Sequence, residues 1–78
     1  MEHHEVSERI EAVFARVMGT PPVKGLDTRP EDTETWDSLA HVELFTALES
    51  DLARRLPREL MLIGPELGAF AAALKAAP

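Results

Sequence analysis

The chain has 78 residues, no cysteine and a formal net charge of −6. This length allows a single small domain over residues 1–78, with one core and no deep cleft between domains, so a free-standing enzyme is not expected. The absence of cysteine excludes disulfides, thiolate metal ligands and any thiol of the chain's own, and the acidic charge disfavours nucleic acid and anionic lipid while favouring basic protein surfaces as partners.

The start of the chain and its charged clusters carry no targeting or metal-site pattern. The first residues lack the basic region and apolar core of a signal peptide, and no apolar run approaches the length of a membrane span. His3 and His4 have no further ligands fixed nearby, and the acidic residues of 31–37 lack the pattern of a calcium loop. We therefore expect a cytoplasmic protein without a membrane partner or a bound metal, and we expect it to be monomeric.

Residues 5–18 are predicted to form the first helix. Apolar residues at helical spacing define one face of it: Val6, Ile10, Val13, Phe14 and Val17. Gly19 and the prolines that follow cannot continue the helix. Residues 19–37 then form a long connection without a sustained period, in which the expected anchors to the core are Val23, Leu26 and Trp36.

A second helix is predicted over residues 38–54, with Asp37 or Ser38 as its N-terminal cap. On a helical wheel it carries two stripes. The stripe expected to face the core contains His41, Leu44, Phe45, Leu48 and Leu52. The adjoining stripe, beside Ser38, mixes apolar and polar residues: Leu39, Val42, Glu43, Thr46, Glu49 and Ser50. Such a stripe either docks a partner or is an ordinary solvated face, and the spacing leaves both open.

Two shorter helices complete the prediction. Pro57 ends the second helix and begins a short third helix that extends to about residue 63. After the Gly64-Pro65 break, residues 66–76 form the last helix, with one apolar side made of Leu67, Phe70, Ala71 and Leu74. No segment shows the alternation of a strand. The predicted fold is therefore all-α, a four-helix bundle with a long first loop and a short third helix.

Ser38, at the start of the second helix, has two interpretations. A serine at this position usually caps the helix with its hydroxyl. It can also present that hydroxyl beside the positive end of the helix dipole, where a phosphate group is favoured. No neighbouring side chain would activate it as a nucleophile. His41, one turn on, is interpreted as a partly buried, hydrogen-bonded histidine rather than a general base, so no catalytic residue is predicted.

The run that begins at Asp37 resembles the modification site of acyl carrier proteins. Three pieces of that family's pattern occur here at the family spacing: Asp37-Ser38-Leu39, Val42-Glu43-Leu44 and Ala47-Leu48-Glu49. A loop rich in proline and acidic residues precedes them. The specific likeness covers residues 37–49, and the order of the predicted helices extends it over nearly the whole chain.

The resemblance implies a carrier rather than an enzyme. In this family the serine that matches Ser38 is esterified to 4′-phosphopantetheine, which a separate phosphopantetheinyl transferase takes from coenzyme A. The thiol of that arm holds acyl groups as thioesters and presents them to acyl-loading and acyl-processing enzymes. The residues expected to dock these partners, most of them at the family's docking positions, are Asp37, Leu39, Val42, Glu43, Thr46 and Glu49.

The chain departs from the carriers of fatty acid synthesis at several positions. Thr35-Trp36 stands where those proteins often have Gly-Ala or Gly-Gly, Ala40 replaces a frequent acid, and Thr46 replaces a large apolar residue. The Trp-Asp-Ser-Leu form resembles discrete carriers of secondary metabolism, whose cargo is a polyketide, hydroxyacyl or aminoacyl group. Two alternatives stay open: an unmodified interaction module that docks through the second helix, and a small enzyme, which no acid–base or nucleophile–base pair supports.

Overall fold

The computed structural model describes residues 3–76, and their regular secondary structure is entirely helical. The three α-helices are α1 (His3–Met18), α2 (Ser38–Leu52) and α3 (Gly68–Ala76). Three short 3-10 segments lie between them: η1 (Gly25–Asp27), η2 (Pro30–Asp32) and η3 (Arg58–Met61). The all-α prediction is confirmed for these residues. A bundle of four α-helices is not what the described residues form, because the predicted short third helix is only the 3-10 turn η3.

The reason that η3 stays so short lies in its flanks. Pro57 and Leu62 on either side of it have extended backbone, with ψ of 139° and 126°. Its turns close through hydrogen bonds from Leu60 N to Pro57 O and from Leu62 N to Glu59 O, at 3.0 and 3.3 Å. Starting an α-helix is unfavourable until enough further residues add their hydrogen bonds. The segment between Pro57 and Gly64 is too short to supply them.

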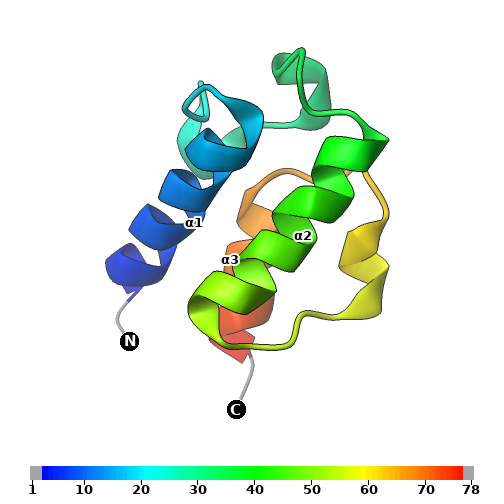
Figure 1. Ribbon diagram of the computed structural model, residues 1–78. Helices are drawn as coiled ribbons and strands as arrows, with labels where there is room; N and C mark the ends of the chain where they lie inside the picture. The colour runs from blue at the N-terminus through cyan, green and yellow to red at the C-terminus, as the bar shows by residue number, and fades with distance from the viewer. Residues whose placement is uncertain (1–2, 77–78) are drawn as a thin grey trace.

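Helix α1 packs against both α2 and α3, and η3 packs against α2 (Figure 1). In Figure 1, α1 runs upward and α2 runs downward beside it. As a result α1 begins and α3 ends at the lower end of the molecule, whereas α2 begins at the upper end.

The core is one cluster of buried apolar side chains from all three α-helices and two connections. Its members are Val6, Ile10, Val13, Phe14, Met18, Trp36, Leu44, Phe45, Leu48, Leu56, Leu67, Phe70, Ala71 and Leu74. Most of the predicted core positions belong to this cluster, whereas Val17, Leu26 and Leu52 are partly buried against it. His41 is buried as a polar residue beside the apolar cluster. Met18 and Leu56 are core residues that the sequence pattern does not indicate.

The long connection between α1 and α2 is anchored by fewer apolar residues than predicted. Trp36 is buried, with its ring edge-on to Phe14 at a centroid distance of 5.2 Å, and Leu26 is partly buried against the core. Val23 is 65% exposed, so its prediction as an anchor is wrong. Its short side chain lies just before η1, outside the reach of the cluster.

A polar residue, Thr28, anchors this connection instead. Its side chain is fully buried, donates to Gly25 O at 2.7 Å and accepts from Lys24 N at 2.8 Å. Its backbone carbonyl accepts from Leu67 N at 2.8 Å. Thr28 therefore closes the turn around η1 and ties the connection to the start of α3.

Candidate functional site

The site begins at the first turn of α2, where Asp37 is the helix cap. Its backbone is extended, and its Oδ1 accepts from Ala40 N at 2.8 Å. Ser38 is the first helical residue, and its side chain is exposed. No hydrogen bond among residues 3–76 involves its hydroxyl. Of the two capping candidates, Asp37 therefore caps the helix. Ser38 is exposed and takes no part in the cap.

The backbone of this turn offers hydrogen-bond donors. An α-helix leaves its first N–H groups without intrahelical acceptors, and its dipole places partial positive charge there. Asp37 takes the N–H of Ala40, whereas the N–H groups of Ser38 and Leu39 have no acceptor within the described range 3–76. Oxygens of a phosphate ester at Ser38 would lie beside these donors.

The acidic connection before Ser38 compensates part of its own charge. The carboxylate of Asp32, in η2, accepts from Arg29 N at 3.0 Å and from Lys24 Nζ at 3.2 Å. The hydrogen bond from Arg29, followed by that from Lys24, lowers the pKa of Asp32. Asp32 is thus ionised and paired locally, while Glu31 and Glu34 are exposed.

Behind the first turn of α2, a buried histidine joins three parts of the chain. His41 is 1% exposed, and its Nδ1 accepts from Trp36 Nε1 at 3.0 Å. Its Nε2 lies 2.6 Å from Leu60 O. Because an indole N–H only donates and a carbonyl only accepts, Nε2 carries the proton in this arrangement. The predicted hydrogen bonding of His41 is confirmed through both ring nitrogens, whereas the residue is fully rather than partly buried.

Aromatic contacts reinforce the same junction. The rings of Trp36 and His41 are stacked at 6.0 Å with an interplanar angle of 13°, and His41 also lies 5.7 Å from the ring of Phe70 in α3. Together with the bond to Leu60 O, these contacts hold the end of the long connection, η3 and α3 against α2. These contacts, one turn along α2 from Ser38, therefore hold the start of α2 in place.

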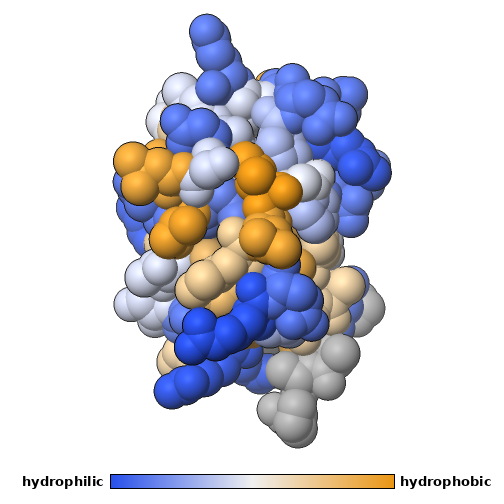
Figure 2. Space-filling view, turned by 90° about the vertical axis from the view of Figure 1, so that its right-hand side faces the viewer, coloured by the Kyte–Doolittle hydropathy of each residue, from blue (hydrophilic) through white to orange (hydrophobic). Residues whose placement is uncertain are grey.

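The stripe of α2 beside Ser38 faces solvent. Leu39 is 70% exposed and Val42 is 43% exposed, and Glu43 and Thr46 are also exposed. Apolar side chains at the end of η3 and just after it are exposed as well: Met61, Leu62 and Ile63. Figure 2 shows apolar side chains gathered on the face that carries η3, with hydrophilic ones above and below. The contribution from η3 is not indicated by any periodicity.

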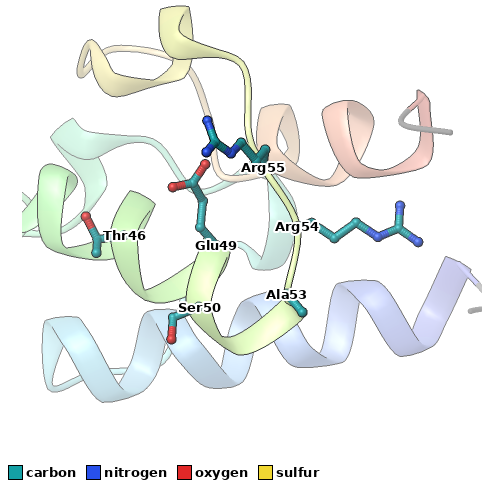
Figure 3. A pocket seen from close by; sticks show the side chains of 6 residues that line it. All are labelled: Thr46, Glu49, Ser50, Ala53, Arg54 and Arg55. Atoms are coloured by element: carbon teal, nitrogen blue, oxygen red, sulfur yellow. The ribbon is translucent and has the colours of Figure 1, made fainter.

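Glu49 differs from the other predicted docking residues. It is partly buried, and its Oε2 accepts from Leu56 N at 2.8 Å, which joins α2 to the segment after it. It also lines a shallow hollow at the end of α2 with Thr46, Ser50, Ala53, Arg54 and Arg55 (Figure 3). In Figure 3 the side chains of Glu49 and Arg55 point toward each other, whereas Arg54 points away. Glu49 thus has a structural contact of its own.

Three further observations bear on function. Among the described side chains of residues 5–75, no three His, Asp or Glu gather as ligands of a metal ion would, and the side chains of His3 and His4 lie outside this range. The described helices also include none with the length and apolar character that a membrane crossing needs. The chain matches no protein-family model, no curated protein sequence and no solved structure. A function is therefore inferred from the residue pattern and the geometry together.

Proposed function

We propose that this chain is a carrier protein of the acyl carrier type, with 4′-phosphopantetheine attached to Ser38. The observation that carries the proposal is the exposed Ser38 hydroxyl at the first residue of α2, with the capping role taken by Asp37. A serine that served as the cap would have its hydroxyl engaged with the backbone. Here the residue that the family modifies is the one left accessible.

The modification is a displacement at phosphorus. The Ser38 oxygen forms a bond to the phosphorus that bears pantetheine, the phosphoanhydride bond of coenzyme A breaks, and 3′,5′-adenosine diphosphate leaves. The serine proton passes to a base of the transferase. The attached arm supplies a thiol on which acyl groups travel as thioesters, and this chain has no cysteine to compete with it.

The surroundings of Ser38 fit a phosphodiester. The N–H groups of Ser38 and Leu39 are available to its oxygens, and the helix dipole favours its negative charge. The nearby carboxylate of Asp37 is oriented by Ala40 N, and that of Asp32 is paired with Lys24. Both acids are thereby engaged with partners of their own.

The exposed apolar residues support docking of the loading and processing enzymes. Leu39, Val42 and Glu43 lie on α2 beside the modified residue, and the apolar residues after η3 extend the same kind of surface. Basic enzyme surfaces would recognise the acids, and the apolar side chains would supply the buried contact area. In a four-helix carrier architecture, η3 would take the place of the short third helix. As part of the same proposal, the carrier is located in the cytoplasm and its cargo is an acyl group of secondary metabolism.

An unmodified interaction module is the second candidate, and one observation favours it. The exposed Leu39, Val42 and Leu62 would suit protein docking whether or not Ser38 carries a group. An enzymatic role has less support, because His41 has both ring nitrogens engaged and lies away from solvent.

Intact mass spectrometry tests the carrier proposal. The purified chain is incubated with coenzyme A and a broad-specificity phosphopantetheinyl transferase. The wild type should gain the mass of one arm, and Ser38→Ala should gain none. Ser50→Ala is the matched control, since Ser50 is an exposed serine on the same helix and its loss should change nothing. A wild type that stays unmodified with several transferases would refute the carrier function and favour the interaction module.

A further inference from the structure

Among the described residues, His41 is the one titratable side chain that the fold buries, with 1% of its surface exposed. Three elements cover it: the end of the long connection through Trp36, η3 through Leu60, and α3 through Phe70. Its Nδ1 accepts from the indole and its Nε2 donates to Leu60 O, so the imidazole is neutral in this arrangement. The carrier function proposed above makes no use of this group.

No charged side chain is bonded to the imidazole of His41. Its two hydrogen-bond partners are uncharged, and neither the acids and bases of the covering elements nor any described charged side chain of α1 forms an ion pair with it. The charged residues closest to it along the elements around it are all exposed: Glu34 and Asp37 on the connection, Glu43 on α2, Arg58 and Glu59 on η3, and Lys75 on α3.

A proton added to His41 conflicts with this packing. An imidazolium donates from both ring nitrogens, and an indole N–H only donates, so two N–H groups would face each other between His41 and Trp36. The positive charge would also be buried without a counter-ion. A histidine that is open to water takes up a proton at about pH 6.5. Because the open arrangement binds this proton more readily than the closed one, falling pH favours the open arrangement.

Of the three covers, η3 is the least secured. Trp36 and Phe70 are buried members of the core, whereas Leu60 is only partly buried against it. Water can reach a protonated imidazole when the cover that moves is the one on the side of η3, which packs against α2 alone among the α-helices (Figure 1).

The chain around η3 is held at few points. All residues of 57–65 except Leu60 are exposed. Among the described residues, the contact of Leu60 O with His41 is the one hydrogen bond that joins this segment to the rest of the molecule. Hydrogen bonds donated by Leu56 N and by Leu67 N fix the chain just outside its two ends. The segment can therefore leave α2 while both of its ends stay in place.

We propose that His41 makes the packing of residues 57–65 against α2 sensitive to acid. The neutral imidazole holds Leu60 O at neutral pH. When His41 takes up a proton, the segment leaves α2 and water reaches the imidazolium, while the three α-helices stay folded. The exposed apolar residues at the end of η3 and just after it change position with the segment. The device consists of the chain's own residues and does not depend on any group attached to Ser38.

NMR of the isotope-labelled full chain between about pH 7.5 and 5.5 tests this proposal. The imidazole nitrogen shifts report the protonation of His41, and amide hydrogen exchange reports the release of the segment. After correction for the intrinsic rate, the amides of Leu60 and Leu62 should exchange about tenfold faster at the lower pH, because the open form gains one proton. The buried α1 amides of Ile10 and Val13 should not. Protonation without faster exchange at Leu60 and Leu62, or equal acceleration in α1, would overturn the proposal.

His41→Gln removes the proton while keeping an amide that can accept and donate. The exchange of Leu60 and Leu62 should then change with pH by less than about twofold. The double variant His3→Gln, His4→Gln is the matched control, since it removes the other two histidines of the chain and should keep the whole effect. An acid effect that persists in His41→Gln, or one that the control variant lacks, would refute the role of His41.

Ser38→Ala should respond to acid as the wild type does, so a failure of this device and a failure of the carrier function give separate results. The imidazole shifts of the wild type test the same link between protonation and release without any substitution in the buried junction. If His41 stayed neutral at the lower pH while residues 57–65 were released, the device would be refuted on the wild-type chain alone.

Discussion

Leu48 and Leu39 are the same residue type on the same helix, yet Leu48 is fully buried and Leu39 is 70% exposed. Leu48 lies on the face of α2 that joins the core with Leu44 and Phe45, whereas Leu39 lies on the face beside Ser38. Folding requires the first face and does not require the second. Apolar residues on the second face are therefore available for contact with another molecule, and the following substitutions measure how independent the two faces are.

The largest effect is expected from Leu48→Ala. It removes a fully buried side chain and should lower the free energy of unfolding by about 2–4 kcal/mol, a large part of the ~4–10 kcal/mol available to a domain of this size. Leu39→Ala is the matched control and should cost less than about 0.5 kcal/mol. Urea unfolding followed by circular dichroism measures both. Equal losses would mean that the two faces are not energetically distinct.

His41→Ala should have the next largest effect, because His41 is the polar member of the buried face. The substitution leaves Trp36 Nε1 and Leu60 O without their partner, and we expect a loss of about 2–3 kcal/mol. The indole N–H resonance of Trp36, the only tryptophan, should shift strongly. Thr46→Ala on the exposed face should leave both measurements nearly unchanged. A loss below about 1 kcal/mol would show that the junction is not needed for stability.

A smaller effect on stability is expected from substitutions at the start of α2. Asp37→Ala removes the cap and should cost about 1 kcal/mol. Ser38→Ala should cost less than about 0.5 kcal/mol, because the hydroxyl of Ser38 makes no hydrogen bond within residues 3–76. Thermal unfolding of the two variants distinguishes them. The reverse order would mean that Ser38 is the cap in solution.

The smallest effect on stability, and the one specific to the exposed face, is expected from Glu43→Lys. Glu43 is exposed and has no ion pair among the described residues, so stability should change by less than about 0.5 kcal/mol. The kcat/KM of the transferase for this variant should fall severalfold, through slower association. Glu5→Lys makes the same change of charge on α1. An equal fall for both variants would assign the effect to net charge.

The helices and most of the core could be predicted because they follow from the spacing of apolar residues. The face of α1 with Val6, Ile10, Val13 and Phe14 is buried as predicted, and so are Leu67, just before α3, and Phe70, Ala71 and Leu74 within it. Each is a repeat of the helical period, which the sequence shows directly. The length of the third helix could not be predicted in this way, since Pro57 is compatible both with an α-helix start and with a 3-10 turn.

The contacts that complete the candidate site depend on tertiary structure. Neither the bond between Trp36 and His41 nor that between Glu49 and Leu56 N follows a local spacing rule. The position of Ser38 at a helix start could be predicted, but the choice of Asp37 as the cap needed the geometry of the turn. Thr28 was missed as an anchor because a threonine in a loop gives no hydrophobic signal.

The course of the helices has a practical consequence for experiments on Ser38. Because α1 begins and α3 ends at the same end of the molecule (Figure 1), Ser38, as the first residue of α2, lies at the opposite end from both. An affinity tag, a fluorescent fusion or a bead attached to either terminus would leave the approach to this residue clear. Immobilised protein therefore suits the transferase assay as well as protein in solution.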